Sequence, residues 1–311
     1  MPLQNQYNHN MLNKVVIGTR GSELALWQAH YVEYIFKAKN IDVEIKIIST
    51  QGDEIQHLSF DKMEGKGFFT KEIEAALLQK TIDLAVHSHK DLETTNPAGL
   101  EIAAVSYREN PSDVLLILPH AYDASATLGL KKGAVVGTSS ARRKTQLLAF
   151  RPDCSTLDLR GNVPTRIQKL KNQQYDAILL AAAGLNRLNI STEGLIVKEL
   201  NPKEFIPAPA QGVLGLQIRT EDQVLKQWLQ QNFHHPDVAQ CIEEEREVLR
   251  NLHGGCQLPL GSYCYVENNQ FTLQISLGIS ENEVLRLEKT ADSPKGLAHQ
   301  ILDALKKNAQ H

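Results

Sequence analysis

The sequence has 311 residues, enough for two or three domains that each bury a core of their own. Hydrophobic residues make up 42% of the chain and charged residues 22%, values typical of a soluble globular protein. The 33 Lys and Arg residues nearly balance the 36 Asp and Glu residues, and the net charge of −3 excludes a general attraction to nucleic acid or anionic membranes. Any anion site therefore has to be built locally.

The chain carries no signal for secretion, membrane insertion or a metal site. Its first fourteen residues are polar, and nowhere do about eighteen apolar residues follow one another. We therefore expect a cytoplasmic protein. Neither a CxxC pair nor zinc-ligand spacing occurs among the four cysteines, which are Cys154, Cys241, Cys256 and Cys264. The sequence thus predicts no disulfide framework and no bound metal.

The first third of the chain alternates short apolar strands with amphipathic helices. The predicted strands are 15–17, 43–49, 82–86 and 101–105, and the predicted helices are 24–35 and about 69–80. Ser22 is a plausible N-cap of the first helix. Ser88, Lys90 and Asp91 crowd together after strand 82–86. Open α/β sheets bind ligands at that end of a strand, so we expect a site there.

A second α/β unit follows a crossing at residues 108–113. Its predicted strands are 114–118, 135–136, 156–159 and 177–181, and one helix opens within 137–143 and runs through 150. Asn162 can cap another helix, with Pro164 in its first turn. A proline-rich crossing at 207–212 then leads to strand 214–219, which can return to the first sheet, and to a helix near 221–231.

The final portion has an α+β pattern. We expect a helix at about 237–251, alternating strands at about 260–291 and a last helix at about 294–307. Between the first helix and the strands, Cys256 stands between two glycines and a proline rather than in an apolar run. Such a thiol is exposed, and an ordinary loop cysteine is the simplest interpretation of it.

Arginines concentrate near predicted helix N-termini, where the helix dipole disfavours cations by about 0.3 to 1 kcal/mol at an exposed site. Arg20, Arg142, Arg143 and Arg166 lie at or near such ends, and Arg160 lies in the turn before one. A bound polyanion would compensate this arrangement. The sequence has no P-loop and no strand-linked GxGxxG, so a ligand with several carboxylates fits better than a nucleotide.

These motifs together resemble the porphobilinogen deaminase family, from about Val15 to the final helix. The matching segments, each weak alone but specific in this order, are 18–22 with 24–29, 65–72, 85–88 with Lys90 and Asp91, 137–140 with Arg142 and Arg143, 160–162 with Thr165 and Arg166, 211–212, and 254–257.

The resemblance implies an α/β fold with two periplasmic-binding-protein-like α/β domains and a smaller α+β C-terminal domain. Domain 1 would comprise residues 1–109 and 208–232, domain 2 residues 110–207, and domain 3 residues 233–311. It also implies a monomeric transferase of haem and tetrapyrrole biosynthesis, with no nucleic acid or membrane partner. The family joins four porphobilinogen molecules head to tail with loss of ammonia, and hydrolysis then releases hydroxymethylbilane.

The resemblance also assigns roles to residues. Cys256 would carry a dipyrromethane cofactor through a thioether, and Asp91 would be the catalytic carboxylate. Other residues would bind the carboxylates of cofactor and substrate: Arg20, Ser22, Ser88, Lys90, Thr138, Ser140, Arg142, Arg143, Arg160, Arg166, Arg187 and Gln211. We expect motion of the domains or of loop 62–69 to make room for the growing product.

Some positions depart from the family pattern. Ala210 stands where glycine is usual, and alanine tolerates a positive φ less well. Leu92 and Glu93 replace the usual Val and Pro. Two other functions stay open on the residues alone: a non-catalytic solute-binding protein with an arginine-lined cleft, and a cysteine enzyme that uses Cys256 as its nucleophile.

Overall fold

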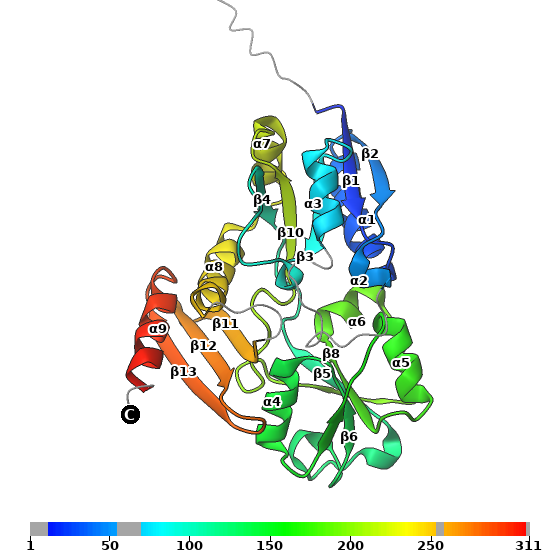
Figure 1. Ribbon diagram of the computed structural model, residues 1–311, viewed down its shortest axis with the longest axis vertical. Helices are drawn as coiled ribbons and strands as arrows, with labels where there is room; N and C mark the ends of the chain where they lie inside the picture. Colours follow the sequence, from blue (N-terminus) through cyan, green and yellow to red (C-terminus); the bar gives the residue numbers. More distant parts are fainter. Residues whose placement is uncertain (1–11, 55–69, 253–257, 309–311) are drawn as a thin grey trace, which may run out of the picture.

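The computed structural model describes residues 12–54, 70–252 and 258–308, which form three sheets flanked by helices (Figure 1). Two of the sheets have five strands and the third has three. This arrangement confirms the predicted fold class of two α/β units and a smaller α+β unit. Within the described residues, no helix is long and apolar enough to cross a membrane.

The first sheet has the strand order β2-β1-β3-β10-β4. Its strands are β1 (Lys14–Thr19), β2 (Asp42–Ile47), β3 (Leu84–Ser88), β4 (Leu100–Val105) and β10 (Leu214–Arg219). Its helices are α1 (Glu23–Lys37), α2 (Gln51–Glu54), α3 (Lys71–Leu78) and α7 (Gln223–Asn232). Strand β10 runs antiparallel to β3 and β4. The strand after the second crossing therefore returns to the first sheet, as predicted.

The second sheet repeats this plan, with the strand order β7-β6-β8-β5-β9. Its strands are β5 (Asp113–Ile117), β6 (Val135–Gly137), β7 (Ser155–Leu157), β8 (Ala177–Ala181) and β9 (Ile196–Glu199). Its α-helices are α4 (Ala141–Phe150), α5 (Val163–Lys171) and α6 (Ala182–Leu188). Strand β5 is antiparallel to both its neighbours. In each sheet, the antiparallel strand in fourth place is thus the one that directly follows a crossing.

Local capping signals were good guides to helix starts. Ser22 Oγ accepts a hydrogen bond from the amide of Ala25 at 3.3 Å, and Asn162 Oδ1 accepts one from Thr165 at 2.9 Å. Both predicted caps are therefore confirmed.

Other bounds were wrong by one to three residues. The predicted strand 82–86 lies at Leu84–Ser88, strand 156–159 lies at Ser155–Leu157, and the last helix begins at Leu297 rather than 294. The sequence prediction also missed α6 and β9. Both are too short to show a clear hydrophobic period.

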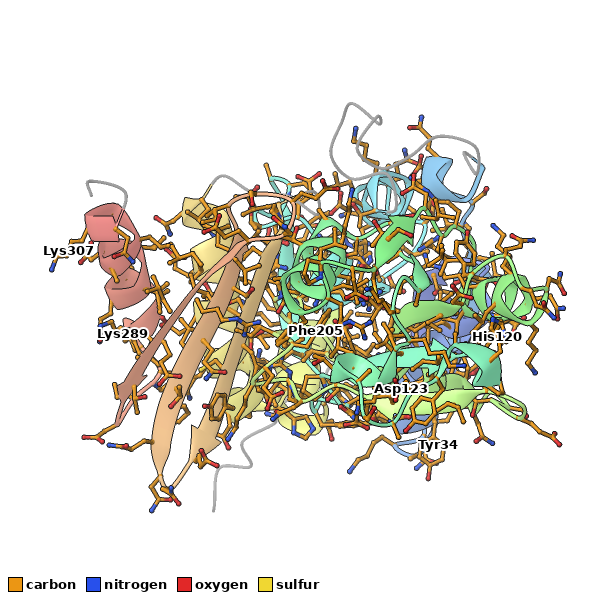
Figure 2. All side chains as sticks on the ribbon, turned by 90° about the horizontal axis from the view of Figure 1, so that it is seen from below. Tyr34, His120, Asp123, Phe205, Lys289 and Lys307 are labelled. Carbon is orange, nitrogen blue, oxygen red and sulfur yellow. The ribbon has the colours of Figure 1, made fainter. Side chains whose placement is uncertain are left out.

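The third unit packs two helices on a three-stranded antiparallel sheet. Its elements are α8 (Pro236–Asn251), β11 (Leu260–Glu267), β12 (Gln270–Gly278), β13 (Val284–Ala291) and α9 (Leu297–Asn308). Figure 2 shows this sheet and α9 beside the two α/β units, with Phe205 between the sheet and the rest of the molecule. Arg286 of β13 donates to the carbonyl of Glu204 at 2.6 Å, which holds the third unit against the segment before the second crossing.

The two crossings run side by side. The amide of Glu109 donates to the carbonyl of Gly212 at 3.0 Å, and that of Leu214 donates to Ser106 Oγ at 2.9 Å. Ala210 has a φ of +59° and is fully buried. The alanine that replaces the usual glycine therefore occupies the left-handed conformation that glycine tolerates best.

Candidate functional site

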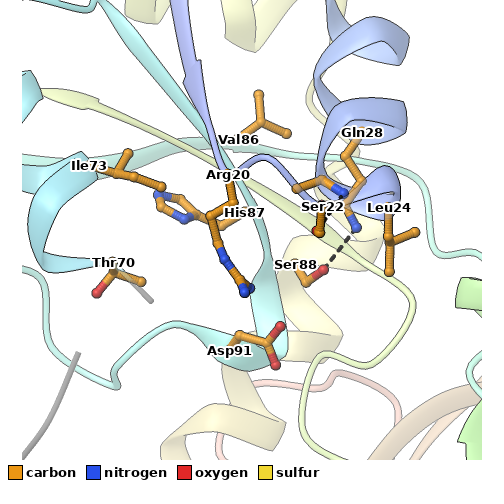
Figure 3. Close-up of a pocket in the computed structure, with 11 residues that line it drawn as sticks. Arg20, Ser22, Leu24, Gln28, Thr70, Ile73, Val86, His87, Ser88 and Asp91 are labelled. Atoms are coloured by element: carbon orange, nitrogen blue, oxygen red, sulfur yellow. Dashed lines mark hydrogen bonds between the residues drawn. The ribbon is translucent and has the colours of Figure 1, made fainter. Parts of the chain in front are cut away.

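The carboxyl ends of β1 and β3 form one wall of a pocket (Figure 3). These strands are parallel neighbours, so the segments that follow them meet at the same edge of the sheet. The turn after β1 carries Arg20 and the capping residue Ser22, and both line the pocket. In Figure 3 the guanidinium of Arg20 points toward the turn that carries Asp91. The structure thus brings together three residues that the sequence predicted as neighbours in a site.

A partly buried hydrogen bond orients Ser88 at this edge. Gln28 Nε2 donates to Ser88 Oγ at 2.8 Å, and Gln28 is only 2% exposed. The sequence reasoning missed Gln28 as a site residue. The available signal was a polar side chain on the face of α1 that also buries Ala29 and Val32. A polar group at such a position needs a partner, and here the partner is a pocket residue.

A short 3₁₀ turn, η2 (His89–Asp91), follows β3 and carries the central pair of charges. Asp91 is exposed and lines the pocket. Lys90 is partly buried, and its Nζ donates to Gln211 Oε1 at 3.3 Å. Burial lowers the pKa of Lys90 to about 8, although the charge of Asp91 acts in the opposite direction. Lys90 is therefore a cation that can lose its proton within the neutral to mildly alkaline range.

The second unit contributes a carboxylate that the sequence reasoning did not assign to the site and that acts electrostatically on Lys90. Asp113, the first residue of β5, is fully buried. It accepts hydrogen bonds from Arg142 Nη1 at 2.6 Å and from Arg143 Nη2 at 2.7 Å. Burial alone would raise the pKa of Asp113, but the two guanidinium groups outweigh it and hold this pKa well below its usual range. The arginines that open α4 thus already have one compensating anion inside the protein.

Gln211 connects the turn after β3 to the second unit. Its Nε2 donates to Asp113 Oδ1 at 2.9 Å and to the carbonyl of Pro111 at 2.7 Å, while its Oε1 accepts from Lys90. The residue is fully buried and lies on the second crossing. One amide therefore links the turn after β3 to the start of β5.

Arg160 and Arg166 add further positive charge on the side of the second unit. Arg166 Nε donates to the carbonyl of Gly161 at 2.7 Å. Burial lowers the pKa of Arg166 to about 10, and the charges of Arg143 and Arg160 act in the same direction while Asp91 opposes them. These mutual effects mean that the three arginines and Asp91 share one electrostatic environment, although they come from different units.

The predicted hydroxyl ligands Thr138 and Ser140 lie at the start of α4. Ser140 is the N-cap of α4, with its Oγ accepting from the amide of Arg143 at 3.4 Å. Thr138 Oγ1 accepts from the amide of Ser140 at 3.2 Å. Both hydroxyls are therefore oriented by the backbone, and each still has a proton to donate.

Arg187 lies elsewhere, at the junction of α6 with α1. Its Nη2 donates to the carbonyl of Gly212 at 2.7 Å, and its guanidinium lies 5.8 Å from the ring centroid of Trp27. Its Nε is buried without a hydrogen-bond partner. In this conformation Arg187 links the second unit to the second crossing and to the first unit. A carboxylate ligand for Arg187 stays a prediction.

Helix α8 of the third unit braces both crossings. Glu245 is fully buried and accepts hydrogen bonds from both terminal nitrogens of Arg108, at 2.5 and 3.2 Å. It also accepts from the amide of Ala210 at 2.7 Å and that of Cys264 at 2.8 Å. Arg108 lies on the first crossing and Ala210 on the second, so one carboxylate holds the two crossings and β11 together.

The next residue of α8 supports the turn that carries Asp91. Arg246 is 6% exposed, and its Nη1 donates to the carbonyl of His89 at 3.2 Å and to that of Leu92 at 3.3 Å. These carbonyls lie on either side of Asp91. The third unit therefore contacts the backbone of the pocket directly.

Two predictions lie outside the described residues. These are Cys256 as the attachment point of a cofactor, and motion of loop 62–69 that makes room for the growing product.

Family models match most of the chain. The model described as "Porphobilinogen deaminase, dipyromethane cofactor binding domain" matches residues 15–227, and "Porphobilinogen deaminase, C-terminal domain" matches residues 239–307. Among curated relatives, the porphobilinogen deaminase of Helicobacter hepaticus is 43% identical over 282 residues, which cover 90% of this chain and 85% of that protein. The enzyme of Maridesulfovibrio salexigens is 42% identical over 303 residues, covering 94% and 96%.

Solved structures show a weaker likeness. The periplasmic VFT2 domain of BvgS from Bordetella pertussis is 14% identical, with a TM-score of 0.42, and the match covers 70% of this chain and 86% of that one.

Proposed function

The chain belongs to the porphobilinogen deaminase family, and we propose that Asp91 is the carboxylate on which its catalysis depends. The chain is a transferase that assembles tetrapyrroles from a small pyrrole substrate on a dipyrromethane cofactor. Family membership favours this activity over the two alternatives that the residues alone left open. The observation that carries the proposal is that Asp91 is the one carboxylate among the described residues that line the pocket.

The residues around Asp91 fit a cofactor and substrate that each carry several carboxylates. Among the described residues of this region cations outnumber carboxylates: Lys90, Arg142, Arg143, Arg160 and Arg166 interact electrostatically with one another and with Asp91 and Asp113. Burial is the largest cause of the lowered pKa values of Lys90, about 8, and Arg166, about 10, and repulsion by neighbouring guanidinium groups adds to it. A bound carboxylate would relieve this repulsion. The donor set therefore matches the ligand that the family model implies.

Asp91 has the exposure and the position to act on the reacting pyrrole. Its carboxylate can accept a hydrogen bond from a pyrrole N–H and so fix the ring in the pocket. It can also stabilise positive charge that develops on the substrate as ammonia departs. The adjacent Lys90 and the nearby Arg20 would bind the acetate and propionate groups, and Ser22 and Ser88 would complete that set with hydroxyl donors. When bound, the cofactor supplies the pyrrole end to which substrate units are added.

The proposal is tested by the variant Asp91→Asn. The amide keeps the size of the side chain but removes its charge, and turnover should fall by about 10² to 10³, the usual loss when one electrostatic stabiliser is removed. Intact mass should still show the dipyrromethane group, because Asp91 is not its attachment residue. Glu93→Gln is the matched control, because Glu93 is a nearby acid outside this pocket and lines another hollow with Lys71 and Glu74.

Two results would contradict this role for Asp91. One is an Asp91→Asn enzyme that turns over within a factor of three of the control. The other is a variant whose purified mass equals the bare chain, since its defect would then lie in cofactor loading.

We also propose that Cys256 carries the cofactor and that four porphobilinogen units are joined before hydrolysis releases hydroxymethylbilane. The intact mass of the wild-type protein, measured alone and after brief exposure to porphobilinogen, should show the bare chain plus dipyrromethane and then a ladder of added pyrrole units. A Cys256→Ser protein should show neither. A ladder on the Cys256→Ser protein would exclude attachment at this residue.

The division into residues 1–109 with 208–232, 110–207 and 233–311 is likewise our proposal, as are a cytoplasmic location and a monomeric state. A single species of the mass of one chain in size-exclusion chromatography with light scattering is the expected result for a monomer. A concentration-dependent increase in mass would contradict it.

A further inference from the structure

The third unit contains a pair of thiols that the proposed chemistry does not use. Cys241 on α8 and Cys264 on β11 are 8% and 2% exposed, and both belong to the core between the helices and the sheet. Both are free cysteines, and each thiol is the largest influence on the pKa of the other. The remaining described cysteine, Cys154, is buried in the core of the second unit. The two thiols are therefore neighbours within one core cluster of the third unit.

The backbone around the pair is already fixed. Glu245, one turn after Cys241 on α8, accepts a hydrogen bond from the amide of Cys264 at 2.8 Å. The helix and the strand are thus joined at the level of the two thiols. Formation of an S–S bond of about 2.05 Å does not require distant elements to come together.

The surroundings give the two thiols different reactivity. The neighbouring thiol of Cys264 lowers the pKa of Cys241, although burial and the charge of Glu245 oppose this effect, and the charge of Arg108 acts in the same direction as Cys264. The neighbouring thiol of Cys241 and burial both raise the pKa of Cys264. Cys241 is also the more exposed of the two. Since the thiolate is the nucleophilic form, Cys241 is the residue that reacts first.

We propose that Cys241 and Cys264 form a reversible disulfide when the protein meets hydrogen peroxide. The Cys241 thiolate attacks one peroxide oxygen, so that an S–O bond forms, the O–O bond breaks and the leaving hydroxide takes up a proton as water. The Cys264 sulfur then attacks the sulfenic sulfur, so that the S–S bond forms and the S–O oxygen leaves as a second water with the thiol proton. Two electrons pass from the thiols to the peroxide, and a dithiol reductant restores them.

The disulfide closes a ring from residue 241 to residue 264, which includes the segment that carries Cys256. It joins α8 to β11 beside Glu245. The hydrogen bonds of Glu245 are accepted by its carboxylate oxygens, so disulfide formation leaves them in place. Neither Cys241 nor Cys264 lines the pocket of Asp91, and the proposal does not depend on the assignment of that pocket.

The holoenzyme is treated with excess hydrogen peroxide, quenched with catalase and alkylated in denaturant. Disulfide formation should lower the mass of the protein by about 2 Da, and the oxidised protein should take up two fewer alkyl groups than the untreated protein. Dithiothreitol should restore both the mass and the number of alkyl groups. Trypsin leaves Cys256 and Cys264 on one peptide, residues 251–286, so chymotrypsin is added before sequencing. The cross-linked peptides should pair Cys241 with Cys264. Cys241 should also react at least about tenfold faster than Cys154.

Cys154→Ser is the matched control and should form the same cross-link, whereas Cys241→Ser and Cys264→Ser should not. The peptide map of the wild-type protein decides the question even if a variant folds poorly. A cross-link that involves Cys256 or Cys154 would overturn the proposal, as would over-oxidation of Cys241 without any cross-link. The proposal would also be overturned if Cys241 and Cys264 stayed unmodified under conditions in which a peroxide-sensitive reference thiol is fully oxidised.

Discussion

Replacing Glu245 with glutamine should destabilise the whole molecule, because this buried carboxylate satisfies donors from three segments. In Glu245→Gln one side-chain oxygen becomes an NH₂ group. Each carboxylate oxygen of Glu245 now accepts two hydrogen bonds: Oε1 from Arg108 and Cys264, and Oε2 from Arg108 and Ala210. Either orientation of the amide therefore sets an NH₂ group against two donors. It also leaves the guanidinium of Arg108 buried without a counter-charge.

The size of the effect follows from the burial of this ion pair. Side-chain exposure is 12% for Arg108 and zero for Glu245. Breaking such a pair costs about 3 to 5 kcal/mol. With about 2 to 4 °C lost per kcal/mol in a chain above about 150 residues, the first thermal unfolding transition should fall by roughly 6 to 20 °C.

The control is Glu243→Gln on the same helix. Glu243 is 62% exposed, and its pairing with Arg250 at 3.1 Å should contribute at most about 1 kcal/mol. Differential scanning fluorimetry of the two variants beside wild type provides the comparison. A Glu245→Gln protein that melts within 2 °C of the control would refute the reasoning, because the carboxylate charge would then not be required. A double-mutant cycle with Arg108→Met should show a coupling energy of about 0.5 to 3 kcal/mol between the two side chains.

Three further predictions concern pH and the second crossing. Burial lowers the pKa of His87 to about 4 and that of His89 to about 3, so the free energy of unfolding should be highest above about pH 6.5 and fall by about 4 kcal/mol between pH 7 and pH 5. A His87→Gln protein should lose about half of this pH dependence in urea unfolding, and an unchanged dependence of the unfolding free energy on pH would contradict the prediction. Because the pKa of Lys90 is about 8, KM for the pyrrole substrate should rise above pH 8 as Lys90 loses its charge, whereas the Lys90→Arg protein should keep a constant KM to pH 9. Parallel pH profiles of KM for the two proteins would exclude Lys90 as the titrating group. Ala210→Gly should raise the first unfolding transition by about 1 to 4 °C, because it relieves about 1 to 2 kcal/mol of positive-φ strain and returns about half of that as chain entropy. A lower transition would show that Ala210 is not strained.

Much of the fold was predictable because its signals are local. Ser22 and Asn162 cap helices through donors three residues away, and a short apolar run such as Ala177–Ala181 reads as a buried strand on its own. The polar cluster after β3 was also predictable, since the carboxyl end of a strand places it at the sheet edge. These features need no knowledge of the rest of the chain.

The remaining parts depend on partners far away in sequence. Arg142 and Arg143 were predicted to bind an external anion, but their internal partner, Asp113, is 29 and 30 residues away. Arg108 and Glu245 are separated by 137 residues. No periodicity or motif pairs such charges, and only the folded chain shows that they are buried together. Residue type predicted the cationic character of the site but not which cations are neutralised within the protein.

The contacts of α8 indicate where the site can change shape. Arg246 binds the backbone on either side of Asp91, and Glu245 binds both crossings. Both side chains are buried and charged, and hydrogen bonds to charged groups are the stronger ones. By contrast, Lys90 meets Gln211 through a single bond of 3.3 Å to a neutral amide. A relative shift of the two α/β units would therefore break the Lys90 contact before it separates α8 from the turn of Asp91. Asp91, the proposed catalytic carboxylate, would keep its position relative to the third unit while the arginine-bearing second unit moved to admit a longer product.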